Sequence, residues 1–191
     1  PQPEPESEPE SEPEPEVDTS LFDIISEWTQ LGQDIDGEAA LDASGYSVSL
    51  SSDGTIVAIG AYHNESNGEE ETGHVRVYEY IGTVWTQLGQ DIDGEAADDW
   101  SGRSVSLSSD GYTVAIGATK NGGNGQYSGH VRVYKYNGVD TWTQLGQDID
   151  GEAADDASGY SVSLSSDGTI VAIGAIWNGG HGYRSGHVRV Y

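Results

Sequence analysis

Cysteine and methionine are absent from this 191-residue chain, phenylalanine occurs once, and 7 basic residues stand against 33 acidic ones. Without cysteine there is no disulfide, no thiolate nucleophile and no thiolate-bound zinc or iron–sulfur cluster. The formal net charge of -26 repels phosphate backbones and anionic lipid heads, which disfavours nucleic acid and membrane surfaces as partners. No apolar run approaches the roughly 18 residues that a membrane span needs, so we expect no membrane span in this chain.

Proline is missing from most of the chain, because all 6 prolines lie in residues 1–18 together with seven glutamates and Asp18. Proline interrupts helix and sheet hydrogen bonding, and the glutamates repel one another. The composition predicts a disordered, acidic Pro/Glu-rich tail over residues 1–18 and a linker over 19–27. The tail is either a spacer or an acidic ligand for a basic partner or for cations, and the sequence does not separate the two.

The rest of the chain contains an internal repeat. Trp28, Trp85 and Trp142 recur every 57 residues, and residues 28–61 match residues 142–175 at 33 of 34 positions. Residues 85–118 match the same copy at 30 of 34. Each copy continues into a variable stretch and then a Gly-His-Val-Arg-Val-Tyr segment. We therefore divide 28–191 into three repeats, 28–84, 85–141 and 142–191.

Each repeat carries the pattern of four strands. In 46–52 apolar residues alternate with serine, 55–61 is apolar on both faces, and 74–80 alternates again. Residues 85–90 form a shorter fourth strand, while Asp53-Gly54 marks a hairpin turn. The sequence therefore predicts an all-β protein of β-propeller blades, each of four antiparallel strands, without helices.

The run Ser-Gly-Tyr-Ser-Val-Ser-Leu-Ser-Ser-Asp-Gly-Thr-Ile-Val-Ala-Ile-Gly-Ala and its two partner runs resemble the FG-GAP repeat of integrin α-chain propellers and related microbial surface proteins. That family brackets two strands with Phe-Gly-x-Ser-Val and Gly-Ala-Pro. Here the phenylalanine is Ser44 and the proline after Gly60-Ala61 is missing. The resemblance implies a β-propeller used in extracellular adhesion or recognition, without catalysis.

Calcium is the first ion to consider, because FG-GAP blades often carry an aspartate-rich calcium loop between the first two strands. The Ser-Ser-Asp-Gly turns here retain too few carboxylates for that site. A different set of aspartates recurs in the loop after the fourth-strand pattern and could collect calcium, or could simply be polar loop residues. Its members are Asp34, Asp36, Asp42, Asp91, Asp93, Asp99, Asp148, Asp150 and Asp156. We otherwise predict no cofactor.

A second candidate is the His-x-Arg-x-Tyr face that begins at His74, His130 and His187. It is compatible with a shared metal or anion site. The alternative is that each arginine pairs with an acidic loop of its own or a neighbouring blade. No carboxylates stand at helical or hairpin spacing to these histidines, which favours the arginine pairing.

Catalysis is not expected, because the serine, histidine and aspartate residues are copied with the scaffold and no nucleophile elbow, P-loop or metalloprotease spacing is present. The copies differ most in the loops 62–72, 119–128 and 176–185, and loops on rigid scaffolds carry function. Their aromatic side chains are candidate ligand-binding residues: Tyr62, Tyr127, Trp177 and Tyr183. Asn64 fits the N-glycosylation acceptor pattern.

The function predicted from these observations is a non-catalytic extracellular or cell-surface recognition and adhesion module that binds a protein or glycan ligand through the variable loops. A lectin-type propeller and a structural repeat of a filament or wall are the alternatives. Three blades are fewer than a ring needs. We therefore expect either further blades of a longer chain or self-association, as a two-chain ring or by strand donation from residues 28–34.

Overall fold

Every blade opens with a serine-rich strand, which is joined to the next strand by a Ser-Ser-Asp-Gly turn. In the first copy the Asp53 carboxylate accepts hydrogen bonds from Ser51 Oγ at 2.7 Å and from the Thr55 amide at 3.0 Å. Gly54 follows with φ at 74°, a left-handed conformation that glycine adopts without steric cost. These hydrogen bonds lower the pKa of Asp53 to about 2, so the carboxylate is committed to its own turn.

The computed structural model describes residues 28–65, 68 and 70–191. The predicted tail 1–18 and linker 19–27 lie outside these residues. Residues 31–191 form one compact unit, and strands are the regular elements throughout its described part. The all-β prediction is therefore confirmed. None of the described residues belongs to a helix long and apolar enough to cross a membrane.

The first blade is an antiparallel sheet with the order β1-β2-β3-β4, the order expected for a propeller blade. The short β5 also pairs with β3, through Val75 opposite Ile92, an addition that the sequence pattern did not indicate. The bounds are β1 (Ser47–Leu50), β2 (Ile56–Ala61), β3 (His74–Ile81), β4 (Val84–Gln87) and β5 (Ile92–Asp93).

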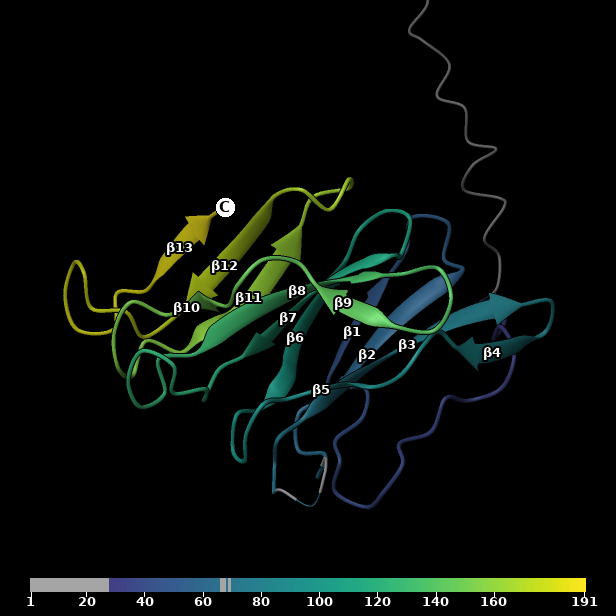
Figure 1. Ribbon diagram of the computed structural model, residues 1–191, viewed down its shortest axis with the longest axis horizontal. Helices are drawn as coiled ribbons and strands as arrows, with labels where there is room; N and C mark the ends of the chain where they lie inside the picture. The colour runs from purple at the N-terminus through teal and green to yellow at the C-terminus, as the bar shows by residue number, and fades with distance from the viewer. Residues whose placement is uncertain (1–27, 66–67, 69) are drawn as a thin grey trace, which may run out of the picture. The chain divides into compact units, whose positions relative to one another are not determined.

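The second and third blades repeat this topology (Figure 1). The second comprises β6 (Ser101–Leu107), β7 (Thr113–Ala118), β8 (His130–Tyr136), β9 (Trp142–Gln144) and β10 (Ile149–Asp150). The third comprises β11 (Ser158–Leu164), β12 (Val171–Ala175) and β13 (His187–Val190), without a fourth strand among the described residues.

The strand predicted at residues 28–34 is wrong for the described residues, which carry no strand there. In the other copies the equivalent strand pairs with the third strand of the blade before it, as β4 does with β3. In the described part of the chain, no strand equivalent to β3 precedes residue 28. The segment is therefore paired with no strand among the described residues.

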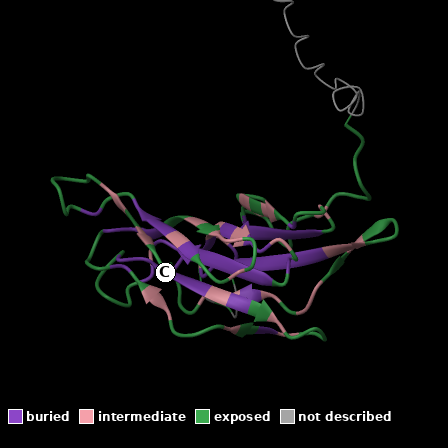
Figure 2. Ribbon diagram, turned by 90° about the horizontal axis from the view of Figure 1, so that it is seen from above, coloured by how far each residue is buried: buried purple, intermediate pink, exposed green. Residues whose placement is uncertain are grey.

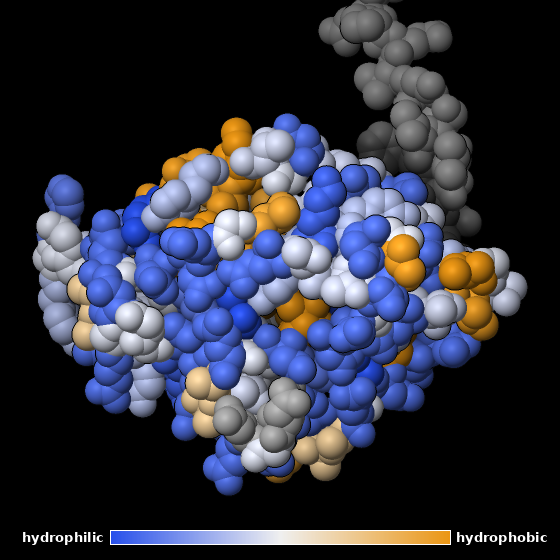
Figure 3. Space-filling view, in the orientation of Figure 1, coloured by the Kyte–Doolittle hydropathy of each residue, from blue (hydrophilic) through white to orange (hydrophobic). Residues whose placement is uncertain are grey.

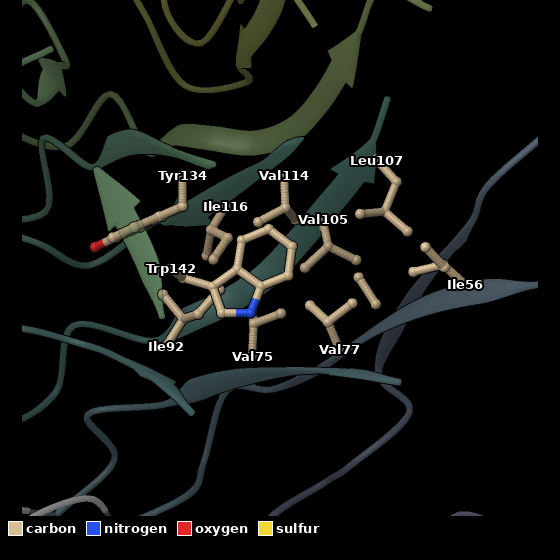
Figure 4. Packing of buried hydrophobic residues seen from close by; sticks show 11 residues of the cluster. Ile56, Val75, Val77, Ile92, Val105, Leu107, Val114, Ile116, Tyr134 and Trp142 are labelled. Atoms are coloured by element: carbon tan, nitrogen blue, oxygen red, sulfur yellow. The ribbon is translucent and has the colours of Figure 1, made fainter. Parts of the chain in front are cut away.

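The core lies between the blades, whose sheets stack face against face. Ile56, Val75 and Val77 of the first blade are at most 3% exposed and pack against Val105 and Leu107 of β6 (Figure 4). The same stacking recurs between the second and third blades. Figure 2 shows the consequence, with buried residues concentrated in the strands and exposed ones in the connections.

Small residues let the neighbouring sheets approach closely at their inner strands. A Cβ added to Gly60 would lie 2.1 Å from the carbonyl oxygen of Gly102, and Gly117 stands in the same relation to Gly159. Ser47 Oγ donates to that Gly102 oxygen at 2.7 Å, and Ser104 Oγ repeats the bond to Gly159. The alternating serines of the first strand therefore hold one blade to the next.

The two outermost sheet faces have no such neighbour in the described chain. Val75 and Val77 are fully buried, whereas their equivalents Val188 and Val190 are 67% and 65% exposed. At the other end Val48 is 63% exposed. Figure 3 shows hydrophobic surface in the region where Figure 1 places the carboxyl end of the chain.

We predict that Gly117→Ala destabilises the chain by about 1–3 kcal/mol, because the new methyl group would enter the backbone of the third blade. Gly174→Ala is the matched control. Its methyl group would meet only the Ser161 side chain at close range. Denaturant unfolding of both variants at low protein concentration measures the difference. Equal loss of stability in the two would contradict the role of this close approach.

Candidate functional site

A cleft of about 380 Å³ lies where the second and third blades meet, at the end of the sheets that carries the variable loops. The β7–β8 and β12–β13 loops and the starts of β6 and β11 form its walls. Four of the lining residues are aromatic and two are cationic. The lining consists of Trp100, Arg103, Thr119, Lys120, Tyr127, Ala157, Tyr160 and Trp177.

Cations and aromatic rings pack together around this cleft. The Arg103 guanidinium lies over two rings, Tyr46 of the first blade and Tyr160 of the third, at 4.4 Å from each centroid. The Lys120 ammonium lies 3.5 Å from the centroid of Trp100. Such contacts contribute about 0.5–1 kcal/mol each at exposed sites, so they fix the rings before any ligand arrives.

The backbone positions two aromatic side chains that line the cleft from different elements. Trp100 and Tyr127 both have left-handed backbone, with φ at 60° and 55°. Non-glycine residues in that region carry a strain of about 1–3 kcal/mol. Hydrogen bonds between blades stabilise this strained backbone conformation. The Trp100 amide donates to the Glu71 carbonyl at 3.3 Å, and the Ala157 amide donates to the Tyr127 carbonyl at 3.0 Å.

The Glu71 side chain adds a polar contact at the same place. Its Oε2 accepts a hydrogen bond from Trp100 Nε1 at 2.8 Å, and this bond is the main reason that the pKa of Glu71 is lowered. Lys120 Nζ lies 3.9 Å from the same oxygen. The carboxylate therefore orients both the indole and the ammonium at the rim of the cleft.

The structure gathers the four aromatic residues proposed from the variable loops along one surface. Tyr127 and Trp177 line the cleft, and Trp177 also borders a neighbouring hollow with Tyr183. Tyr62 lies beside Trp100, with ring centroids 5.2 Å apart. Whether they bind a ligand stays a prediction.

Sequence reasoning missed Trp100 and Arg103, although a signal was present. Residues 85–118 differ from residues 142–175 at four positions only, and two of the four are these residues. Their equivalents in the third copy, Ala157 and Tyr160, line the opposite wall of the same cleft.

The arginines of the His-x-Arg-x-Tyr face pair with the acidic segment of their own repeat, which confirms that interpretation. Arg132 donates to the Asp93 carbonyl at 2.9 Å and lies 3.3 Å from Glu95. Arg76 makes the same contacts with Asp36 and Glu38. Each arginine therefore ties a blade to the segment that connects it with the blade before.

The histidines have carboxylate neighbours, although none stands at helical or hairpin spacing in the sequence. Nδ1 of His74 lies 3.9 Å from an oxygen of Glu38 and from one of Asp91, and His130 has the equivalent neighbours Glu95 and Asp148. Burial, with the charge of Arg132 acting in the same direction, lowers the pKa of His130 to about 4. The carboxylates come from segments that are distant in sequence, which linear spacing does not reveal.

The predicted calcium ligands divide between several roles. Asp91 and Asp148 face the histidines, whereas Asp99 accepts hydrogen bonds from Asn121 and from the Ala96 amide. Asp156 repeats the contacts of Asp99, Asp42 accepts from the Ala39 amide, and Asp36, Asp93 and Asp150 each offer a carbonyl to an arginine. In the described residues no three of these aspartates form a group that could share one ion. Calcium binding by Asp34 or the others stays a prediction.

Asn64, the candidate glycosylation site, is 6% exposed. Its backbone is held as well, because its amide donates to the Ala61 carbonyl and its carbonyl accepts from the Gly73 amide. A glycan needs an accessible side-chain nitrogen, so this placement disfavours modification of the folded chain.

Residues 92–134, from β5 to β8, match the family model of the FG-GAP repeat. The middle copy is an FG-GAP repeat. This finding confirms the resemblance for the second blade, and the first and third copies carry nearly the same scaffold sequence. Within the matched residues, β6 contributes Arg103 to the cleft, and Gly117 of β7 approaches the Gly159 carbonyl of the third blade.

Two solved structures are similar to the chain over 75% of its length. One is a "putative 6-phosphogluconolactonase" from Bacteroides uniformis, with 16% identity, a TM-score of 0.44 and 40% of its own chain covered. The other is the hydrazine synthase of Kuenenia stuttgartiensis, with 17% identity, a TM-score of 0.45 and 44% covered. The chain spans less than half the length of either, and neither likeness bears on function. No curated protein matches the chain.

Proposed function

We propose that this chain is a non-catalytic recognition and adhesion module of the extracellular space or the cell surface. The FG-GAP repeats form the scaffold, and the ligand binds at the cleft between the second and third blades. The localisation follows from the use of FG-GAP repeats in surface proteins, which is an argument by resemblance. The site rests on observations of the molecule itself.

The proposal rests on the sequence positions at which the repeat copies differ. The scaffold of the second copy departs from that of the third at four positions, and Trp100 and Arg103 are two of them. Both line the cleft, which is otherwise built from loops that vary between copies. Drift would scatter substitutions over the exposed surface, whereas selection for a ligand concentrates them at its site.

The chemistry of the cleft favours a carbohydrate ligand, the lectin-type alternative. Trp177 and Tyr127 offer flat apolar faces on which a sugar ring stacks, and Arg103 and Lys120 offer hydrogen-bond donors for its hydroxyl or carboxylate groups. Rigid aromatic side chains and arginine are the residues that carry most binding energy at recognition surfaces. A volume of about 380 Å³ suits one or two sugar rings.

The residues that line the cleft include neither a carboxylate nor a histidine, the side chains most often used for proton transfer. The carboxylate at its rim, Glu71, accepts a hydrogen bond from Trp100 Nε1. Binding without turnover is therefore the activity that we assign to it.

The test is a screen of the full chain against immobilised panels of neutral and acidic glycans and of cell-surface proteins, repeated with the double variant Trp100→Ala, Arg103→Tyr. This variant gives the second copy the residues of the third, so the fold tolerates both changes. We expect it to weaken binding at least tenfold, the usual effect of removing central aromatic and arginine anchors.

The matched control is Tyr112→Thr, another position where the second copy departs from the third. Tyr112 stacks on Tyr136, at 6.1 Å between centroids, outside the cleft. Its replacement by the residue of the third copy should leave binding unchanged. If the double variant binds as the parent does, or if the control loses binding equally, the ligand does not occupy this cleft.

A second candidate function, assembly into larger structures, is favoured by the exposed sheet faces at the two ends. The face with Val188 and Val190 is equivalent to the face of the first blade that packs on β6. The face with Val48 and Leu50 is equivalent to β6 itself. The two ends are therefore complementary, and the occupant we propose is a blade of the same repeat from a second copy or a longer chain.

Light scattering and sedimentation of residues 31–191 at increasing concentration test this assembly. We expect association that Val188→Arg abolishes, because a guanidinium cannot be buried there without a partner. Gly174→Ala should also weaken it, since the equivalent Gly117 has no space for a methyl group beside the next blade. A monodisperse monomer at every concentration would contradict the assembly while leaving the recognition cleft untouched.

A further inference from the structure

Two histidine–carboxylate clusters outside the cleft lie at the starts of β3 and β8. In the second blade, Nδ1 of His130 is 3.9 Å from Glu95 Oε2 and 3.8 Å from Asp148 Oδ2. Within each cluster the three potential ligand atoms lie within 4.8 Å of one another. The first-blade cluster is Glu38, His74 and Asp91, and the second-blade cluster is Glu95, His130 and Asp148.

The His130 nitrogen lacks the contact that burial normally demands. The residue is 1% exposed, and its Nδ1 has no hydrogen-bond partner among the described residues. Distances of 3.8 and 3.9 Å to the two carboxylates are too long for hydrogen bonds. Buried polar atoms without a partner are rare in native proteins and point to an unfilled role, such as binding an ion.

The carboxylates are oriented as ligands would be. Gln144 Nε2 donates to Asp148 Oδ1 at 2.7 Å, and Arg132 lies 3.3 Å from Glu95 Oε1. Each carboxylate therefore has one oxygen held by a neighbour and the other turned to His130. Outer contacts of this kind fix the direction of metal ligands.

The first-blade cluster repeats this arrangement. Gln87 Nε2 donates to Asp91 Oδ1 at 2.6 Å, and Arg76 lies 3.5 Å from Glu38 Oε1. The oxygens that remain, Asp91 Oδ2 and Glu38 Oε2, both face His74. The geometry is therefore a property of the repeat and not of one copy.

We propose that each cluster binds one divalent transition-metal ion, with Zn²⁺ as the ion of best fit. Zinc lies about 2.0–2.2 Å from imidazole nitrogen and carboxylate oxygen, so one ion spans atoms that are 3.8–3.9 Å apart. Calcium takes oxygen ligands and has little use for imidazole. Two carboxylates and one neutral imidazole also balance the charge of the ion.

A bound ion would stabilise the joints between blades. Glu95 belongs to the segment that enters the second blade, His130 opens β8 within it, and Asp148 precedes the β10 strand on the way out. An ion held by all three fixes both connections against one strand. In the third copy Glu152 lies 3.5 Å from His187, but no second carboxylate joins them in the described residues.

The experiment is a titration of the chelator-treated full chain with ZnCl₂, followed by calorimetry and by thermal unfolding. We expect two tight sites per chain, one for each cluster. The melting temperature should rise by about 5 °C or more at saturating zinc, because an ion that binds only the folded state stabilises it by mass action. Calcium at the same concentration should produce little shift.

Variants assign the sites. His130→Gln should remove one site, and His74→Gln with His130→Gln should remove both, whereas His187→Gln should leave two. Asp148→Asn provides a milder variant should His130→Gln fold poorly, and its second site should weaken at least tenfold. The acidic tail is present in every variant, so weak binding by its glutamates cancels in the comparison.

Tight zinc binding that persists in the His74→Gln, His130→Gln protein would overturn the proposal. So would the absence of any zinc-dependent rise in melting temperature in the parent chain. In either case the clusters are polar contacts of the blade joints and nothing more. Neither outcome affects the recognition cleft, whose lining shares no residue with the clusters.

Discussion

The close approach of neighbouring sheets at their inner strands is the constraint on which the rest of the molecule depends. Gly60 and Gly117 leave space for a backbone carbonyl of the next blade, and serine hydroxyls donate to those same carbonyls. With any larger side chain the sheets would separate, and the apolar faces between them would admit water. Because this contact recurs at one spacing, it also brings the variable loops of successive blades to the same end of the sheets.

The fixed spacing brings side chains of neighbouring blades together, and together they form sites that a single blade does not have. The cleft exists because residues at the starts of β6 and β11 face the loops beside them across a joint. The distribution of positive charge follows the same division. Three arginines pair with carboxylates at the joints and also lie over tyrosine rings, while Arg103, Lys120 and Arg184 lie on aromatic rings at the loop end. In a chain of net charge -26, three cations gathered at the loop end mark a surface distinct from the rest.

Much of the fold could be predicted from the sequence because the repeat is nearly exact. The period of two in the serine strand, the apolar run of β2 and the Asp-Gly turn all became the elements they predicted. The β5 strand could not be foreseen, since two residues carry no periodicity and depend on β3 for pairing. The site was predicted in part: the loop aromatics lie together, but the carboxylates near His130 come from residues 35 before and 18 after it in the chain. Contacts over such separations depend on how the strands are arranged, and linear spacing does not give that arrangement.

The central claim is that the three repeats share one scaffold and that the ligand binds in the cleft between the second and third blades, at the end of the sheets that carries the variable loops. The chain has five tryptophans, and each indole N–H gives its own resonance in a ¹⁵N-labelled sample. Trp100 and Trp177 line the cleft, whereas Trp85 and Trp142 donate their indole N–H groups to carbonyls of the scaffold. Titration with a glycan or protein identified by binding should shift the resonances of Trp100 and Trp177 and leave those of Trp85 and Trp142 in place. Shifts confined to the scaffold tryptophans would contradict the account.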